Sequence, residues 1–239
     1  MLNRQKATLV HKRELTHQTC LFQFRIEGTD NFVFKPGQFI TFDLPIHDKK
    51  TQRLKSYSIA SHPDGTNLIE LVIVKVPEGL GTGFLFDMQK LSIGTELDFR
   101  GPLGVFVLPE DLSTPHYLVC TGTGIAPFRS MIKHIKQHQI PFHAIHLIFG
   151  TRTLEDALFK EEMEDLANEM ENFHYHLVLS REKWEGRTGY VHDVYKELSA
   201  GQSDAHFLLC GWRPMIDEAR QQLSALGYDK HHVHFELYG

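Results

Sequence analysis

The sequence predicts two domains: an N-terminal antiparallel β-barrel over residues 1–110, then an α/β domain with a doubly wound parallel sheet over residues 111–239. In the first hundred residues, short β-branched and aromatic runs alternate with glycine and proline turns, which is typical of a small barrel. From Tyr117 onward, apolar strands alternate with helical segments, which indicates parallel strands covered by helices. The polar loop between Pro109 and Pro115 separates the two patterns.

Barrel strands are expected where apolar and polar residues alternate or β-branched residues gather. Turns at residues 28–31 and 35–37 separate the early strands. The expected strands cover residues 7–15, 20–27, 38–44, 68–76 and 95–99. Between the last two of these strands, a glycine-rich turn over residues 79–83 leads into a short helical segment over residues 84–91.

In the second domain, apolar runs of strand length alternate with runs of helical spacing. Strands are expected at residues 117–120, 144–149, 173–179, 206–210 and 233–237. Helices are expected at residues 127–139, 154–168, 191–198 and 214–226. Because ligands of such sheets bind beyond the carboxyl ends of the strands, the residues that follow each strand are the candidate site.

Composition excludes several classes of protein. Hydrophobic residues make up 41% of the 239 residues and charged residues 23%, as in ordinary globular proteins. The net charge of -5 and the lack of a basic stripe argue against nucleic acid as a partner. No apolar run approaches the ~20 residues that cross a bilayer, and the N-terminus lacks the apolar core of a signal peptide. We therefore expect a cytoplasmic protein without a membrane span.

Cysteine and histidine usage argues against a metal centre. The chain has three cysteines, Cys20, Cys120 and Cys210, too few for a four-cysteine iron–sulfur cluster or a disulfide framework. Sixteen histidines include close pairs, such as His174 and His176, but no carboxylate or cysteine completes a zinc ligand set. We predict no bound metal, so that any iron–sulfur centre belongs to a partner.

The stretch from Tyr117 to Arg129 is a candidate nucleotide site. A buried strand leads into the turn Thr121-Gly-Thr-Gly124, and Pro127 suits the first turn of the helix that follows. Such a junction gathers free backbone N–H groups at the positive end of a helix dipole, which favours a phosphate. On this stretch alone, an ordinary strand-to-helix turn remains an equal alternative.

Two stretches of the first domain have the chemistry of a flavin nucleotide site. Lys55-Ser-Tyr-Ser58 combines a cation, a flat aromatic ring and hydroxyl groups. Gly79-Leu-Gly-Thr-Gly83 offers backbone N–H groups and the Thr82 hydroxyl to a phosphate. The alternatives are a strand with a polar edge and a plain glycine turn.

In the second domain, Ser180 and Arg181 directly follow the strand that ends at Leu179. A hydroxyl beside an arginine fork suits the ribose 2′-phosphate that distinguishes NADP from NAD. A surface arginine without a ligand is the alternative. Cys210 ends a later strand, where it is either a site residue or a buried core cysteine.

Taken in order, the motifs of the chain resemble those of the ferredoxin–NADP reductase superfamily of flavoprotein reductases. The resemblance rests on Phe34-Lys-Pro-Gly-Gln-Phe39, Lys55-Ser-Tyr-Ser58, Gly79-Leu-Gly-Thr-Gly-Phe-Leu85, Gly101-Pro-Leu-Gly-Val-Phe106, Thr121-Gly-Thr-Gly-Ile-Ala-Pro127, Cys210-Gly-Trp-Arg-Pro-Met215 and Glu236-Leu-Tyr238. Each motif is weak alone, whereas the ordered set, which spans residues 5–239, is specific.

For FAD, the resemblance implies that Tyr57 packs on the isoalloxazine and that Ser58 hydrogen-bonds near the hydride-accepting nitrogen. Lys55 and Thr82 would meet the pyrophosphate, and Tyr238 would cover the other flavin face. The implied FAD-binding residues are Arg53, Lys55, Ser56, Tyr57, Ser58, Ile59, Val72, Val74, Gly81, Thr82, Gly83 and Tyr238. Lys55 stands where the family has arginine, and lysine is a point charge in place of a bidentate fork. We therefore expect either looser pyrophosphate binding or assistance from Arg53. The chain also ends at Gly239, where bacterial members often have a second aromatic residue.

For NADP(H), the resemblance implies that Ser180 and Arg181, with Arg152 and Arg187, hold the 2′-phosphate. The implied NADP-binding residues are Thr123, Gly124, Arg152, Ser180, Arg181, Arg187, Cys210, Gly211 and Met215. Catalytic roles fall to Ser58, Cys210 and Glu236, with the last two beside the reacting nicotinamide carbon.

The resemblance implies a reductase that moves hydride from NADPH to FAD and then single electrons to a carrier such as ferredoxin or flavodoxin. We expect it to be a monomer. One alternative is an NADH-dependent reductase component of an oxygenase, or a free-flavin reductase. Another is a non-catalytic flavin-binding sensor or electron-transfer subunit.

Overall fold

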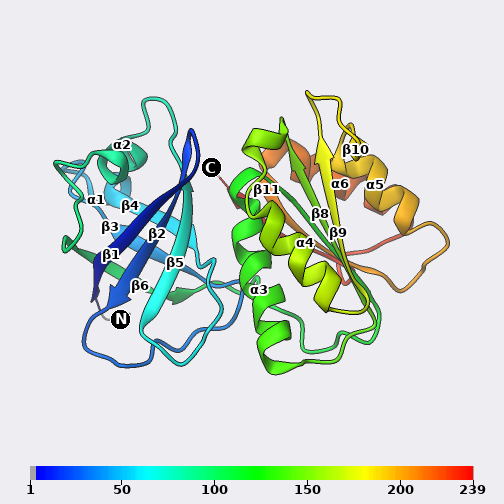
Figure 1. Ribbon diagram of the computed structural model, residues 1–239, viewed down its shortest axis with the longest axis horizontal. Coiled ribbons are helices and arrows are strands. Elements are labelled where there is room, and N and C mark those ends of the chain that lie inside the picture. The colour runs from blue at the N-terminus through cyan, green and yellow to red at the C-terminus, as the bar shows by residue number, and fades with distance from the viewer. Residues whose placement is uncertain (1–3, 239) are drawn as a thin grey trace. The chain divides into compact units, whose positions relative to one another are not determined.

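The computed structural model describes residues 4–238, which form two compact units. Unit 1 extends to Leu108 and includes Arg129–His134; unit 2 contains Pro109–Phe128 and the chain from Ile135 onward. Each unit is built on its own six-stranded sheet (Figure 1). The antiparallel sheet comes first in the chain and the parallel sheet second, as the sequence predicts.

The sheet of unit 1 closes into a barrel. Its strands are β1 (Gln5–Thr16), β2 (Thr19–Ile26), β3 (Phe39–Asp43), β4 (Leu54–Ser58), β5 (Leu68–Val74) and β6 (Glu96–Leu103). They lie in the order β4-β3-β6-β1-β2-β5, and every neighbouring pair is antiparallel. A bridge between Ile59, the residue after β4, and Leu71, in the middle of β5, links the two outermost strands. That bridge removes the open edge that a flat sheet would leave.

Aromatic side chains fill the barrel. The rings of Phe24 and Phe42 lie 5.1 Å apart, and Phe99 meets Phe42 edge to face at 6.4 Å. All three are fully buried, and each buried ring contributes a few kcal/mol through the hydrophobic effect. A short helix, α1 (Lys50–Arg53), lies between β3 and β4 and has no buried residue.

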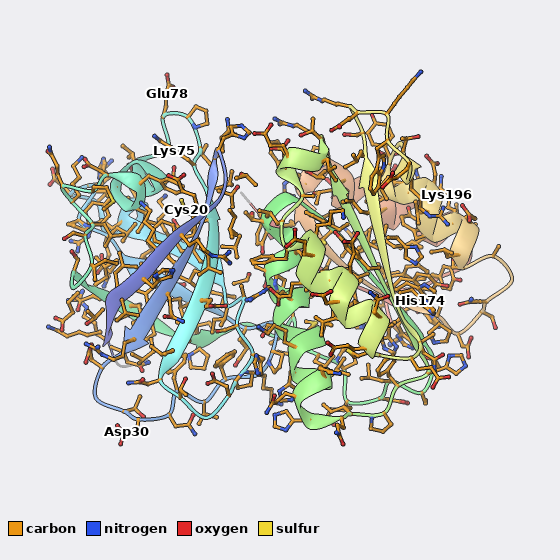
Figure 2. All side chains as sticks on the ribbon, viewed as in Figure 1. Cys20, Asp30, Lys75, Glu78, His174 and Lys196 are labelled. Carbon is orange, nitrogen blue, oxygen red and sulfur yellow. The ribbon has the colours of Figure 1, made fainter. Side chains whose placement is uncertain are left out.

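The second helix of unit 1, α2 (Leu80–Phe86), begins earlier than the sequence predicts. Because glycine is a poor helix former, the pattern favoured a start at Phe84. In the structure Gly81 and Gly83 are part of the helix, and the Gly83 N–H donates a hydrogen bond to the Gly79 carbonyl at 2.7 Å. Residues 87–91, expected to be helical, form a separate turn. Lys75 and Glu78, labelled in Figure 2, mark the loop that leads into α2.

Unit 2 contains the parallel sheet. Its strands are β7 (Pro115–Thr121), β8 (Ala144–Thr151), β9 (Phe173–Leu179), β10 (Arg187–Thr188), β11 (His206–Trp212) and β12 (Val233–Tyr238). They lie in the order β10-β9-β8-β7-β11-β12. The chain builds outward from β7 through β8, β9 and β10, then returns to place β11 on the other side of β7. The strand order therefore reverses between β7 and β11, the point where open α/β sheets bind ligands.

Helices cover both faces of this sheet, with α3 and α4 on one face and α5 and α6 on the other (Figure 1). They are α3 (Ile125–His138), α4 (Lys160–Glu169), α5 (Val191–Leu198) and α6 (Arg213–Ala225). On the second face, Tyr117 and Phe207 of the sheet pack with Val194 of α5 and Ile216 of α6. None of the helices described in residues 4–238 has the length and apolar character needed to cross a membrane.

One long helix of the sequence prediction, residues 154–168, is two elements in the structure. A single 3₁₀ turn, η2 (Leu154–Asp156), is followed by a break, and α4 then begins at Lys160. Phe159 has a left-handed backbone with φ of 55°, which interrupts helical hydrogen bonding. A second 3₁₀ turn, η1 (Gly122–Gly124), starts α3 two residues before Pro127.

Candidate functional site

The predicted flavin segment of unit 1 lies on β4. Lys55 pairs with Phe42 and Tyr57 pairs with Ile40 across β3, so the lysine and the tyrosine share one face of the sheet. The Tyr57 ring is half-buried, and its centroid lies 6.2 Å from that of Phe42. Burial raises the pKa of the Tyr57 phenol, which stays neutral. A flat ring supported from behind suits stacking on a planar ligand.

Lys55 lies along the start of α2. A Cβ atom added to Gly81 would come within 2.9 Å of the Lys55 Cγ, so only glycine lets the lysine stem lie there. Within residues 4–238, the Lys55 ammonium has no ion pair or hydrogen bond. The Lys55 ammonium is unpaired among these residues, and its stem lies against the backbone of Gly81. A free cation beside glycine backbone can hold a diphosphate, so these residues fit FAD.

Arg53, expected to assist Lys55, is engaged elsewhere. Its Nε lies 2.7 Å from Oδ1 of Asp43, and the Asp43 side chain is only 7% exposed. The other oxygen of that carboxylate accepts a hydrogen bond from Arg4 at 2.8 Å. Removing Arg53 from this pair would leave a nearly buried carboxylate with less compensation. Lys55 is therefore the better placed cation.

Thr82 is also engaged. Its hydroxyl accepts a hydrogen bond from the Val76 N–H at 3.1 Å and lies within donor distance of the Val76 and Gly79 carbonyls, at 3.2 and 3.3 Å. These bonds tie the loop before α2 to its first turn. Any contact of Thr82 with a phosphate would have to compete with them.

The other predicted flavin residues differ in exposure. Ser56 is exposed, with its Oγ 2.9 Å from that of Thr41, and it points away from the face of Tyr57. Of the remaining residues, the structure buries Ser58, Ile59 and Val72, half-buries Val74 and exposes Gly83. Ile59, completely buried at the bridge that closes the barrel, contributes mainly to the core.

In unit 2, the turns after β7 and β11 meet at the reversal of strand order. A Cβ atom on Gly124 would lie 2.3 Å from the carbonyl oxygen of Cys210. Gly211 has φ of +158°, and a Cβ atom there would come within 2.7 Å of both the Thr121 hydroxyl and the Met215 methyl group. Glycine is therefore needed on both sides of this junction. The structure thus brings together the predicted residues of the two turns.

Cys210 is completely buried at this junction. It pairs with Cys120 of β7 on one side and with Glu236 of β12 on the other. Burial raises the pKa of the Cys210 thiol well above its ordinary value, the Glu236 carboxylate raises it further, and a hydrogen bond with Tyr238 opposes them. The thiol is therefore protonated and is no nucleophile at neutral pH.

Tyr238 lies over the same turn. Its hydroxyl donates a hydrogen bond to the Thr123 carbonyl at 3.1 Å. The sequence analysis predicts that Tyr238 covers the flavin. In unit 2 it contacts two of the predicted nicotinamide residues, Thr123 and Cys210. Its position on the β7–α3 turn means that a ring entering beside Cys210 would compete with it for space.

Ser180, Arg181 and Arg152 come together beyond the ends of β8 and β9. The Ser180 N–H donates to the Thr151 carbonyl at 3.0 Å, and the Arg181 N–H donates to the Arg152 carbonyl at 2.9 Å. The Ser180 hydroxyl also donates a hydrogen bond to the Thr151 carbonyl, at 3.2 Å. All three predicted side chains are exposed. Two guanidinium groups and a hydroxyl on adjacent strand ends fit a phosphate dianion.

Arg187 does not join this group. On β10, its Nη1 and Nη2 atoms donate to the two carboxylate oxygens of Glu197 at 2.7 and 3.0 Å. This pairing raises the pKa of Arg187 and lowers that of Glu197. Arg187 also lines a cavity of about 460 Å³ beside β9 that contains none of the other predicted site residues.

The structure adds residues that the motifs did not single out. Glu182 accepts a hydrogen bond from the Leu154 N–H at 2.7 Å, so a carboxylate lies next to Arg181. Trp212, 63% exposed, follows Gly211 at the carboxyl end of β11. Both are adjacent in sequence to predicted residues, and their position beyond a strand end was the available signal.

Family models match both halves of the chain. One described as an oxidoreductase FAD-binding domain matches residues 6–108, and one described as an oxidoreductase NAD-binding domain matches residues 118–221. The chain thus has an FAD-binding domain and an NAD-binding domain, as the sequence predicts.

Known proteins resemble the chain over most of its length. It is 33% identical over 242 residues to ferredoxin–NADP reductase B of Sorangium cellulosum, covering 98% of this chain and 97% of that protein. It is 28% identical over 207 residues to the electron transfer component of anthranilate 1,2-dioxygenase from Acinetobacter baylyi, covering 86% of this chain and 58% of that protein. The structure of an Amycolatopsis cytochrome P450 reductase superposes with a TM-score of 0.87 at 26% identity, covering 99% of this chain and 70% of that one.

Proposed function

The chain belongs to the ferredoxin–NADP reductase superfamily, and from that premise we propose that it takes hydride from NADPH onto FAD and passes single electrons to a small carrier protein. It is an oxidoreductase with FAD- and NAD-binding domains. The observation that supports the choice of NADPH is that backbone hydrogen bonds hold Arg152, Ser180 and Arg181 together beyond β8 and β9. The proposed carrier is a ferredoxin, which the name of the Sorangium relative supports, or a flavodoxin.

Residues 1–110 hold FAD in this proposal. When bound, FAD supplies the chemistry that converts a hydride into two single electrons. Tyr57 stacks on its ring, and Lys55 with the backbone of Gly81 and Gly83 holds its diphosphate. The Ser58 hydroxyl donates a hydrogen bond to the ring. Val72 and Val74 of β5 complete the apolar wall, while Arg53, Ser56, Ile59 and Thr82 support the site through the contacts described above.

Residues 111–239 hold the nicotinamide nucleotide. Thr123 and Gly124 line it on one side, and Gly211 and Met215 on the other. The neutral Cys210 thiol contacts the ring without forming a bond, since its raised pKa keeps the proton on sulfur. The proposed role of the Glu236 carboxylate is to orient the ring and exchange a proton, a modest contribution to the barrier. The proposed role of Tyr238 is to cover the flavin ring and to be displaced when the nicotinamide stacks there; its hydrogen bond to the Thr123 carbonyl would break in that exchange.

The substitution Arg181→Ala tests the choice of nucleotide. We expect kcat/KM for NADPH to fall about 10-fold or more, with a much smaller change for NADH, because a charged hydrogen bond to a phosphate contributes roughly 1.5–3 kcal/mol. The measurement is steady-state reduction of ferricyanide with each nucleotide. Lys183→Ala, which removes an exposed cation from the same loop, is the matched control. An unchanged NADPH/NADH ratio in Arg181→Ala would show that the 2′-phosphate assignment is wrong.

A second candidate keeps the fold and changes the partners: an NADH-using reductase component of an oxygenase. Two observations favour it, the Acinetobacter relative and the engagement of Arg187 by Glu197. A wild-type kcat/KM that is higher for NADH than for NADPH would support this candidate over the first.

A further inference from the structure

The direction of the Arg187 side chain follows from the register of β10. Arg187 pairs with Val178 in the parallel ladder, so both side chains project from the same face of the sheet. On that face Val178 packs with Val191 and Val194 of α5. Arg187 therefore points toward α5, where Glu197 receives it.

The position of Glu197 on α5 draws the Arg187 side chain away from the predicted phosphate site. The helix begins at Val191, shortly after β10, and runs back along the sheet, so Glu197 on its last turn lies toward the amino ends of the strands. Lys196, labelled in Figure 2, marks this end of α5. Ser180 and Arg181 lie in the opposite direction, two and three residues beyond Val178, or about 7–10 Å along the strand.

The distance itself does not keep Arg187 out of the phosphate site. Its neighbour Thr188 is paired with Leu179, the residue before Ser180. A long arginine side chain released from Glu197 has that strand end within reach. The bidentate ion pair with Glu197 holds the Arg187 side chain on α5. In this pair the side chain of Arg187 is 35% exposed and that of Glu197 is 62% exposed. Exposed ion pairs contribute little to stability, and a bidentate pair stands at the upper end of their range. A phosphate dianion can therefore compete with the Glu197 carboxylate for Arg187.

We propose that Glu197 is a nucleotide-selectivity residue, which holds Arg187 on α5 and leaves Arg152, Arg181 and Ser180 alone to bind the 2′-phosphate. The inference rests on the proposed function, since it assumes that this group binds that phosphate. Glu197 touches no nucleotide, and it is a positioning residue that acts through Arg187. Its effect is to lower the ratio of the affinity for NADPH to the affinity for NADH.

The test is the binding of NADP⁺ and NAD⁺ to the FAD-loaded protein, measured by calorimetry without turnover. Glu197→Gln removes the charge that holds Arg187, and we expect it to tighten NADP⁺ binding about threefold, the size of a weak ion pair, with NAD⁺ unchanged. In the double variant Glu197→Gln/Arg187→Gln the gain should vanish. Glu171→Gln, which neutralises another exposed carboxylate of unit 2, should change neither affinity.

Two results would overturn the inference: an unchanged NADP⁺/NAD⁺ affinity ratio in Glu197→Gln, or the same gain when Arg187 is absent. A third is a loss of NADP⁺ affinity in Arg187→Gln as large as in Arg181→Ala, because Arg187 would then already bind the phosphate. Arg181→Ala separates the two proposals. If it lowers the ratio while Glu197→Gln does nothing, only the selectivity role fails; if it leaves the ratio unchanged, the phosphate site itself fails.

Discussion

Two histidines of unit 2 show how a single side chain is set by its neighbours. Nδ1 of His146 lies 3.1 Å from Nε2 of His176 on the next strand. The His146 ring stacks on Tyr117 at 4.9 Å and on His174, labelled in Figure 2, at 4.8 Å. Burial, with repulsion from the neighbouring imidazoles, lowers the pKa of both His146 and His176 to about 4. Both rings are therefore neutral in the folded protein at pH 7.

These pKa values predict acid sensitivity. A histidine with a folded pKa of about 4 and an unfolded pKa near 6.5 contributes stability that is complete above pH 6.5 and is lost as pH falls toward 4. After allowance for solvent around these half-exposed rings, we expect about 1 kcal/mol from each. Thermal unfolding followed by circular dichroism between pH 7 and 4 measures it. His146→Phe keeps the stack and should flatten the pH dependence; an unchanged slope would contradict this assignment.

Residue roles were predictable where a sequence motif suggests a shared ligand, and not where one side chain binds another from a different element. The pairing of a cation with a glycine turn suggested Lys55 and Gly81, and the structure puts them in contact. Nothing near Arg53 or Arg187 in the sequence indicates that Asp43 and Glu197 bind them, because those carboxylates come from other elements. Long-range ion pairs of this kind leave no periodic signal.

At the scale of elements, the junction between β7 and α3 depends on one close approach. The Gly124 Cα faces the Cys210 carbonyl so closely that a methyl group has no space. The obstacle is backbone in the middle of a sheet, which moves less readily than a flexible side chain. Any larger residue must therefore separate β11 from the turn that follows β7.

Gly124→Ala should destabilise the protein by roughly 1–3 kcal/mol, the usual cost of overpacking, and weaken nucleotide binding. Gly122, in the same turn, is the control: no atom lies within 4 Å of its added Cβ, and only its φ of +53° opposes alanine. We expect Gly122→Ala to cost about 1 kcal/mol. Melting temperatures and NADP⁺ affinities of the two variants measure the difference. Equal losses in both would mean that the contact with Cys210 is unimportant.

The helices show where periodicity succeeds and where it fails. Apolar spacing predicted α3, α5 and α6 closely, because each buries one face on the sheet. It placed the start of α2 too late, because backbone bonds to the preceding loop hold its glycines in the helix, and it joined η2 to α4 across the left-handed Phe159. Both errors fall where backbone geometry overrides side-chain pattern.

For the whole molecule, the order of strands and motifs determined what could be predicted. The change from alternating runs to strand–helix repeats indicated both sheets and the strand ends that bind ligands. Closure of the barrel through Ile59 and Leu71, and the reversal of strand order between β7 and β11, needed the three-dimensional structure. The choice of electron acceptor depends on surfaces that linear order does not describe.

The most direct test is the visible spectrum of the purified protein under anaerobic conditions, before and after each nucleotide. A protein in which NADPH reduces FAD should be yellow or become so with added FAD. NADPH should then bleach the flavin faster than NADH does, and ferricyanide should restore the colour. A preparation that binds no flavin, or a bound flavin that neither nucleotide bleaches, would contradict the proposed hydride transfer.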